Sequence, residues 1–313
     1  MKGYDSLRSS AAWGDLSGRG KIRMTGEDRV RLLHAMSTND IQQLEVGRAC
    51  YAFFLNAQGR ILADAHIYNL GESLLLDTEP EITQKLMEHL DKYIIADDVT
   101  LTNESENLAA IGVEGPQSEI AMASINAPVP EQLEYLAAWQ EGFVAAVSAT
   151  GAPGFRCFVP ADKKAGLISR LTAAAVAQAD SEAINVVRLE RGKPRYGDDI
   201  TERSLVQETN QLQAVSFTKG CYLGQEIVER VRSRAQIHRV LMPIRVHSHT
   251  PPPPGTKLTV DGKDVAEITS SAFSPGFDAG AALAYVRVEQ EQSKAEMLVA
   301  GSEPPVRALL AAV

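Results

Sequence analysis

The sequence is poor in cysteine. Its 313 residues include three, Cys50, Cys157 and Cys221, and no C-x-x-C pair occurs. An odd number of widely spaced cysteines cannot form a closed disulfide framework, and it cannot supply four ligands for a self-contained zinc or iron-sulfur cage. Both classes of small scaffold are therefore excluded. We expect the protein to work in a reducing compartment, where free thiols persist.

Long hydrophobic runs are also missing. No apolar run approaches the roughly 20 residues that cross a bilayer, and the N-terminal segment holds no secretory apolar core. The 40 acidic and 31 basic side chains give a net charge of -9, which argues against a protein that coats nucleic acid through overall charge. The expectation is a soluble cytoplasmic protein with no membrane partner and no direct binding of nucleic acid.

Several catalytic motifs are absent as well. The chain has no G-x-G-x-x-G after a predicted strand, no G-x-x-x-x-G-K-[ST], no H-E-x-x-H and no G-x-S-x-G. Nucleotide-fold and hydrolase functions therefore lose their usual sequence support. Of the six histidines, only His247 and His249 stand close together, beside a proline run that favours a solvated linker over a metal site. No metal site is predicted.

Hydrophobic residues, by contrast, are plentiful. They form 44% of the chain, enough to close a sizeable core divided into two or three units. Two stretches repeat one pattern, in which strands are followed by a helix. This pattern predicts an α+β protein with two related lobes. The first lobe is expected to contain strands at 21–26, 51–55 and 60–70 and helices at 27–36 and 82–94, and the second to contain strands at 108–114, 143–149 and 155–160 and a helix at 162–179.

The sequence changes character near residue 247. Four prolines at 251–254 cannot continue a helix or a central strand. Beyond them, strand-length segments alternate with turn residues as far as residue 310, and Asp261-Gly262 is a hairpin signal. This predicts a small C-terminal β-barrel or sandwich domain. We place the two lobes in residues 1–242 and the C-terminal domain in residues 243–313.

The segment 219–226, Lys-Gly-Cys-Tyr-Leu-Gly-Gln-Glu, is the most informative part of the chain. Glycines beside Cys221 let another molecule approach the backbone closely. Lys219, and a helix N-terminus if one begins near Gly224, favour the thiolate. These residues predict an accessible, reactive cysteine. The opposite interpretation, a buried cysteine in a tight turn, fits the residues equally well.

The predicted strand 60–70 carries a polar face. Alternation places Asp64, His66 and Tyr68 on one face, while small and branched apolar residues occupy the other. A carboxylate flanked by an imidazole and a phenol suits a lined cavity, where Asp64 orients or protonates an amine. The residues alone leave open a strand face that simply meets solvent.

Glu190 lies in a segment dense in charge and glycine, 188–199. Its carboxylate can accept two parallel hydrogen bonds from a planar amidine-like edge, such as that of an aminopterin ring. An Arg-Glu pair on the surface is the other interpretation.

A local basic excess accompanies the cysteine segment. Residues 219–245 hold six basic side chains against Glu226 and Glu229, and this patch suits polyglutamate carboxylates, phosphates or an acidic partner. A solvated helix face is the competing interpretation. The six basic residues are Lys219, Arg230, Arg232, Arg234, Arg239 and Arg245.

These motifs resemble those of the YgfZ family, the folate-binding relatives of the glycine cleavage T protein, an aminomethyltransferase. Residues 219–226 match the family signature K-G-C-Y-x-G-Q-E throughout. Further similar stretches are 26–47, 56–64, 188–199 and 268–286. The resemblance implies a glycine-cleavage-T-like fold of three lobes around a central channel, with tetrahydrofolate held near their junction.

The resemblance also implies roles for individual residues. Asp64 falls where the aminomethyltransferases keep the carboxylate that contacts a folate nitrogen, and Glu190 falls where they keep the acid that grips the pterin edge. Cys221 and Lys219 belong to the signature that distinguishes YgfZ-type proteins, in which the cysteine is the critical residue. The predicted catalytic set is therefore Cys221, Lys219 and Asp64. The predicted cofactor-binding set is Asp64, Glu190, Tyr222, Gln225, Glu226 and Arg230.

Three functions follow from the resemblance and the residues. In the first, tetrahydrofolate lies between Asp64 and Glu190, and Cys221 lies at the channel mouth for a thiol-mediated or cluster-linked step. This arrangement supports the assembly or repair of iron-sulfur clusters in client enzymes, including enzymes that thiolate tRNA. In the second, the chain is a one-carbon transferase in which Asp64 orients the folate amine, which leaves Cys221 without a task. In the third, the basic segment docks a client protein and folate only stabilises the scaffold. The signature favours the first.

Overall fold

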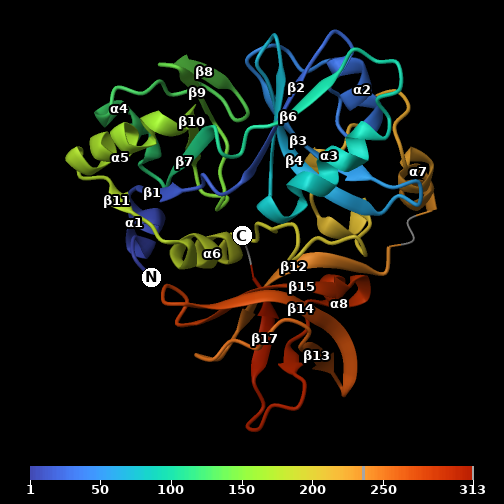
Figure 1. Ribbon diagram of the computed structural model, residues 1–313. Helices are drawn as coiled ribbons and strands as arrows, with labels where there is room; N and C mark the ends of the chain where they lie inside the picture. The colour runs from blue at the N-terminus through green and yellow to red at the C-terminus, as the bar shows by residue number, and fades with distance from the viewer. Residues whose placement is uncertain (235–236, 312–313) are drawn as a thin grey trace.

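The computed structural model of the chain describes residues 1–234 and 237–311. Figure 1 shows three bodies, two sheet-containing lobes side by side and a β-barrel below them. The predicted class, two related α+β lobes followed by a C-terminal barrel, is confirmed. Among the described residues, no helix combines the length and the apolar character needed to span a bilayer.

The first lobe is a five-stranded sheet with two helices. Its sheet has the strand order β3-β4-β5-β2-β6, and all neighbouring strands are antiparallel. The elements in chain order are β2 (Gly20–Thr25), α2 (Arg29–Met36), β3 (Ala49–Leu55), β4 (Ile61–Asn69), β5 (Leu74–Thr78), α3 (Thr83–Asp91) and β6 (Thr100–Asn103).

The second lobe is a six-stranded sheet with the order β11-β1-β7-β10-β9-β8. Its strand β1 (Ala12–Asp15) comes from the N-terminus and was not predicted. The other elements are β7 (Leu108–Glu114), α4 (Ser118–Ser124), β8 (Leu136–Trp139), β9 (Gly142–Ala145), β10 (Gly154–Pro160), α5 (Lys164–Ala173) and β11 (Ala177–Gln178). The helix predicted over 162–179 ends early, because Ala175 adopts φ +57° and the chain then enters β11.

The two lobes repeat one arrangement. In each, a strand, a helix, three strands, a helix and a strand follow in sequence, and β3-β4-β5-β2 matches β8-β9-β10-β7 in sheet order. Gly26 and Gly115 follow the first strand of each lobe with φ of +100° and +124°. A Cβ on Gly26 would collide with the Asp98 carbonyl just before β6, and one on Gly115 would lie 2.5 Å from the Ser10 carbonyl just before β1. Strand β1 therefore takes the place in the second lobe that β6 takes in the first.

The C-terminal body is a closed barrel of six strands in the order β12-β15-β14-β13-β16-β17. Its first strand begins at Arg239, four residues before the predicted boundary, and the prolines at 251–254 join β12 to β13 within the barrel. The elements are β12 (Arg239–Val246), β13 (Lys257–Val260), β14 (Lys263–Ser274), β15 (Ala279–Arg287), α8 (Val288–Ser293), β16 (Met297–Val299) and β17 (Arg307–Leu310).

One helix near the N-terminus and one in the middle of the chain connect the lobes to the barrel. Helix α6 (Ser181–Glu190) begins at Asp180, whose carboxylate accepts a 2.8 Å hydrogen bond from the Ala183 N–H. It packs against α1 (Tyr4–Ser9) and against β14 and β15 of the barrel. Helix α7 (Gln225–Arg234) lies at the outer side of the first lobe, ahead of β12 (Figure 1).

Candidate functional site

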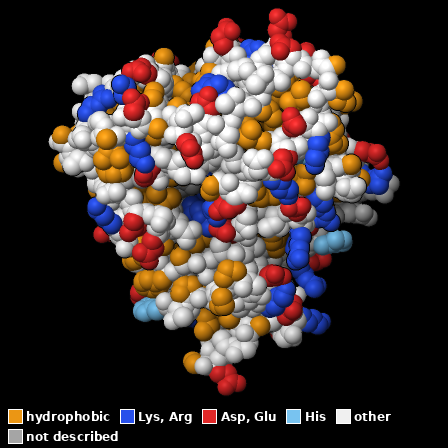
Figure 2. Space-filling model, viewed as in Figure 1, with side chains coloured by type: hydrophobic (Ala, Val, Ile, Leu, Met, Phe, Trp, Pro, Cys, Tyr) orange, Lys and Arg blue, Asp and Glu red, His pale blue; other side chains and the backbone are white. Residues whose placement is uncertain are grey.

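A cavity of about 930 Å³ lies between the two lobes and α6. Its wall comes from β4 and β5 of the first lobe, β10 and the turn 147–152 of the second, α6 with the loop 193–198, and the link 15–19. Figure 2 shows a hollow near the centre of the view where Lys, Arg, Asp and Glu side chains gather. The volume falls in the range of small-molecule sites, about 300–1,000 Å³.

Asp64 reaches this cavity because of the alternation in β4. Ile61, Ala63 and Ile67 point into the core of the first lobe, so Asp64 and His66 face the other way and line the cavity. Of the two interpretations of this strand face, the lined cavity is therefore the correct one. The Tyr51 hydroxyl donates a hydrogen bond to Asp64 Oδ2. Burial raises the pKa of Asp64 to about 6, although the Tyr51 hydrogen bond opposes the shift.

His66 is a neutral imidazole in the cavity wall. Burial, followed by the nearby cations Lys193 and Arg156, holds its pKa well below the ordinary value for histidine. Its Nδ1 is buried and has no hydrogen-bond partner among the described residues. Such an unsatisfied atom is unusual in a protein interior and is common at binding sites.

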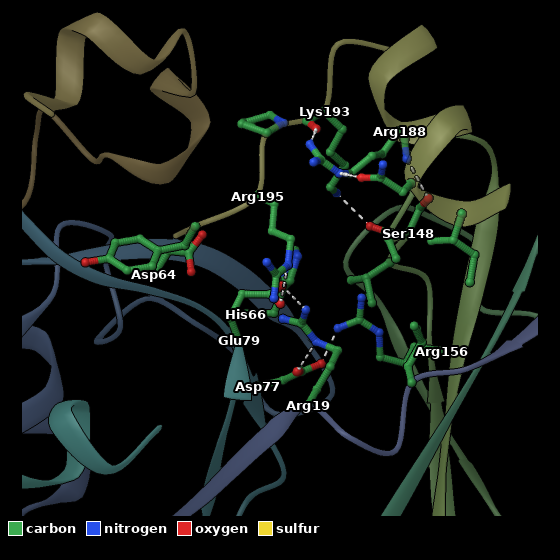
Figure 3. A pocket seen from close by; sticks show the side chains of 18 of the residues that line it. Arg19, Asp64, His66, Asp77, Glu79, Ser148, Arg156, Arg188, Lys193 and Arg195 are labelled. Atoms are coloured by element: carbon green, nitrogen blue, oxygen red, sulfur yellow. Dashed lines mark hydrogen bonds and ion pairs between the residues drawn. The ribbon is translucent and has the colours of Figure 1, made fainter. Parts of the chain in front are cut away.

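An ion network crosses the cavity floor and joins the two lobes (Figure 3). Asp77 on β5 is paired with Arg156 on β10 and, at 2.6 Å, with Arg19. Arg19 also pairs with Glu79, which pairs with Arg195 at 2.9 Å. Asp77 is completely buried, and the two arginines keep its pKa well below the usual range despite the opposing effect of burial.

Lys193 enters the cavity from the loop after α6. Its Nζ donates a 2.6 Å hydrogen bond to the Ser148 carbonyl, as Figure 3 shows. The turn that carries Ser148 is held by Glu114, which accepts hydrogen bonds from the Ser148 hydroxyl and from the Ala149 and Thr150 N–H groups. Burial lowers the pKa of Lys193 to about 8.

Glu190 does not line the cavity. It ends α6 on the side that faces the barrel, where it accepts hydrogen bonds from the hydroxyls of Tyr4 and Ser274. Its second oxygen lies 3.0 Å from Nε of Arg8. The carboxylate thus ties α6 to α1 and to β14. The resemblance places Asp64 and Glu190 in one site. In the structure, Asp64 lines the cavity and Glu190 faces the barrel.

Cys221 is exposed, whereas Cys50 and Cys157 are buried. Burial raises the pKa of each of these two buried thiols to about 12. Cys221 is also outside the set of cavity-lining residues. Its thiol is open to solvent just before α7, which answers the question of accessibility left open by the sequence. The expected place at the mouth of the channel is not observed, because Cys221 does not line the cavity.

Lys219 does not point toward solvent with Cys221. Its Nζ donates hydrogen bonds of 2.5, 2.8 and 2.8 Å to the carbonyls of His34, Ser37 and Asn39, at and beyond the end of α2. Burial lowers its pKa to about 8. A cation at a helix C-terminus stabilises the unsatisfied carbonyls there, so Lys219 fixes the start of the signature segment against the first lobe.

The remaining predicted binding residues surround α7 and do not line the cavity. Tyr222 is buried with its ring 5.0 Å from Nζ of Lys219, and its hydroxyl has no partner among the described residues. Gln225 begins α7. Glu226 and Arg230 form an exposed pair at 2.5 Å one helical turn apart. A pair of this kind contributes little to stability.

The basic segment is largely compensated by acids. Arg232 pairs with Glu229 at 3.0 Å and Arg239 pairs with Glu208 at 3.2 Å, while Arg245 stacks over the ring of Phe277. The side chain of Arg234 lies outside the described part of the chain.

One side chain links the signature segment to the cavity. Asn39, whose carbonyl binds Lys219, donates from Nδ2 to the carbonyls of Tyr51 at 2.9 Å and Gln213 at 3.1 Å. Tyr51 and Gln213 both line the cavity. Three hydrogen bonds, from Lys219 to Asn39, from Asn39 to Tyr51 and from Tyr51 to Asp64, thus connect the cysteine segment to the carboxylate site.

Sequence reasoning missed the ion network. Asp77 and Arg156 are single charges in otherwise apolar strands, and this is a signal that the sequence does offer. Charges in such positions are rarely buried unless they are paired. Which partner each would find depends on how the lobes meet, and no local pattern records it.

Comparisons with known proteins agree with this architecture. Residues 2–219 match the family described as GCVT N-terminal domain, and residues 239–311 match the CAF17, C-terminal beta-barrel domain. The glycine cleavage system aminomethyltransferase T from Bartonella henselae has the same fold, with a TM-score of 0.89 at 21% identity over 99% of this chain and 87% of that one.

Curated relatives share more of the sequence. The putative transferase At1g60990, chloroplastic, of Arabidopsis thaliana is 28% identical over 82% of this chain, which spans 60% of the length of that relative. An aminomethyltransferase of Streptomyces coelicolor is 29% identical over 90% of this chain and 79% of its own length. Because the family match covers well over half of the residues, the chain belongs to the GCVT N-terminal domain family and carries a CAF17-type C-terminal β-barrel.

Proposed function

We propose that this protein is a YgfZ-type protein that binds tetrahydrofolate and uses Cys221 to support the assembly or repair of iron-sulfur clusters in client enzymes, including tRNA-modifying ones. The observation that carries the proposal is the exposed thiol of Cys221, within a complete K-G-C-Y-x-G-Q-E segment that joins a GCVT-type body to a CAF17-type barrel. The other two thiols are buried, so a client can meet Cys221 alone without unfolding the protein.

The cavity residues fit a reduced folate. The volume suffices for a ligand of that size, and the wall offers a carboxyl group, a phenol and a hydrogen-bonding imidazole with an unused Nδ1. Asp64 and His66 would hold the nitrogen-rich part of the ligand. When bound, tetrahydrofolate supplies secondary amines that carry one-carbon units.

Asp64 is suited to hold or accept a proton beside such an amine. A carboxyl group with a pKa near 6 exists in both protonation states close to neutral pH, which is the condition for efficient proton transfer. Tyr51 fixes its orientation by donating to Oδ2. Asp64 is only 8% exposed, so little bulk water competes for this carboxyl group.

The thiol role is tested in cells that lack the native gene and are supplied with variants. Cys221→Ser should lower the activity of client iron-sulfur enzymes at least tenfold, while the purified variant keeps its affinity for tetrahydrofolate. Cys157→Ala, which removes a thiol buried in the second lobe, is the matched control and should support full client activity. Full client activity with Cys221→Ser would reject the thiol role.

A one-carbon transferase is the second candidate, because Asp64 lies in the cavity and the aminomethyltransferase relatives span most of the chain. The purified protein would then convert an aminomethyl-lipoyl carrier and tetrahydrofolate into methylenetetrahydrofolate, ammonia and the free dihydrolipoyl carrier. Asp64→Asn would abolish this turnover and Cys221→Ser would not affect it. Turnover with that pattern would replace the first proposal.

A further inference from the structure

Five cationic side chains line the cavity, and one of them differs from the rest. Arg19, Arg156, Arg188 and Arg195 each pair with at least one carboxylate. None of the ion pairs formed by the described residues includes Lys193, whose ammonium group has the Ser148 carbonyl as its protein acceptor. An ammonium group has three N–H donors, so two remain for another molecule.

We propose that Lys193 is the anion-recognition residue of the cavity, which pairs with a carboxylate of the ligand. This inference rests on the proposed function and makes it more specific, because it requires the ligand to be a folate that still carries its glutamate. Lys193 is half-buried, and withdrawing an ammonium group from water without an opposite charge costs free energy that a ligand carboxylate would offset. The unpaired charge therefore favours an anionic occupant over a neutral pterin.

The surroundings of Lys193 support this role. The largest favourable charge near it is Glu114, whose oxygens already accept hydrogen bonds from residues 148–150. Arg156 and Arg19 act against its protonation, since both carry the same charge. The charged or titratable groups that act on Lys193, or on which it acts, come from three strands and two connecting segments: Glu114, Arg156, Arg19, Asp64, His66 and Glu134.

A proton should be taken up when the carboxylate binds. Burial and the two arginines lower the pKa of Lys193 to about 8, so the free protein is about half protonated there at pH 8. A carboxylate at hydrogen-bond distance favours the charged amine and raises its pKa. Binding at pH 8 is therefore expected to take up roughly half a proton per molecule. Calorimetry in buffers of different ionisation enthalpy measures this quantity.

The test compares tetrahydrofolate with its dimethyl ester, which has a similar shape and no carboxylate. Lys193→Met should weaken tetrahydrofolate binding by roughly 10- to 100-fold, the usual effect of losing a charge-assisted hydrogen bond. It should leave the weaker binding of the ester unchanged and abolish proton uptake. Lys193→Arg should restore most of the affinity. Lys85→Met removes the same charge from the exposed face of α3 and is the matched control.

The outcomes separate the inference from the proposed function. An equal loss for both ligands, or no loss for either, would overturn the role of Lys193 while leaving folate binding intact. Failure of the wild-type protein to bind tetrahydrofolate would overturn both. A thermal melt of Lys193→Met without ligand should show no loss of stability, because the substitution removes a half-buried charge that has no carboxylate partner.

Discussion

At the scale of single residues, two titratable groups in the cavity are held in states that cost stability. Asp64 is a buried carboxyl with a raised pKa, and Lys193 is a half-buried amine with a lowered one. Neither has a partner of opposite charge within ion-pairing distance among the described residues. Residues that destabilise the empty protein in this way are characteristic of binding sites, where a ligand offsets the cost.

The stability cost of Asp64 depends on pH. Because its pKa is about 6 in the folded protein and 3.8 ordinarily, the fold binds this proton more tightly than the unfolded chain, and stability falls as the pH rises between these values. Asp64→Asn should therefore raise the free energy of unfolding by roughly 1–3 kcal/mol at pH 7.5 and by much less at pH 4. Denaturant titrations at the two pH values measure the difference. A variant that is equally destabilised at both would show that the carboxylate is structurally required.

How much the sequence predicts is also decided residue by residue. The cavity position of Asp64 and His66 follows from strand alternation, a local pattern with a period of two. The position of Lys193 does not, because a loop after a helix has no period and its direction depends on the turn 148–151 of another lobe. Glu190 lies in a helix whose two sides face different bodies, and helical spacing alone cannot say which side meets the ligand.

At the scale of secondary structure, the central strands of the two lobes are joined by charge rather than by apolar contact alone. The equivalent strands β5 and β10 supply Asp77 and Arg156, which are exposed by 0% and 2%. A buried pair of this kind contributes little net stability compared with apolar residues, yet it fixes which register of two surfaces can meet. The internal repeat thus places opposite charges on two equivalent strands.

Replacing one partner of the Asp77–Arg156 pair should lower the free energy of unfolding more than replacing both partners. Arg156→Met leaves Asp77 buried with Arg19 as its remaining partner, and we expect a loss of about 3–5 kcal/mol in the free energy of unfolding. The double variant Asp77→Leu, Arg156→Met should recover much of that loss. Chemical denaturation of both variants provides the comparison. Additive losses in the double variant would mean that each side chain stabilises the interface independently.

At the scale of the whole molecule, two carboxylates, one at the end of α6 and one in the loop after it, bind the barrel through hydrogen bonds. Glu190 binds Ser274 of β14, and Asp199 accepts hydrogen bonds from Thr269, at 2.6 Å, and from Ser270 of the same strand. The three bodies therefore meet at α6 and the loop after it, which also form one wall of the cavity. A change in the position of the barrel would reach the ligand site through these residues.

Glu190 can be tested for two different roles, docking of the barrel and binding of the ligand. As a docking residue, it ties α6 to the barrel through Ser274 and to α1 through Tyr4 and Arg8, and the variant Glu190→Ala should lower the free energy of unfolding by roughly 1–3 kcal/mol. Hydrogen exchange should rise in α1 and β14, while tetrahydrofolate affinity changes less than twofold. Ser274→Ala removes one of the hydrogen-bond donors to Glu190, and it should raise hydrogen exchange in the same elements by a smaller amount.

The family resemblance assigns the same residue to the pterin edge, and that role gives the opposite pattern. A carboxylate that accepts two hydrogen bonds from the ligand would make Glu190→Ala lose tenfold or more in affinity. Exchange in α1 and β14 would then stay unchanged, and Ser274→Ala would have no effect on binding. Because Glu190 already accepts hydrogen bonds from Tyr4 and Ser274 and pairs with Arg8, a ligand would first have to displace partners that hold the barrel. If Glu190→Ala lost both affinity for tetrahydrofolate and protection of α1 and β14 from hydrogen exchange, folate binding and barrel docking would compete for one carboxylate.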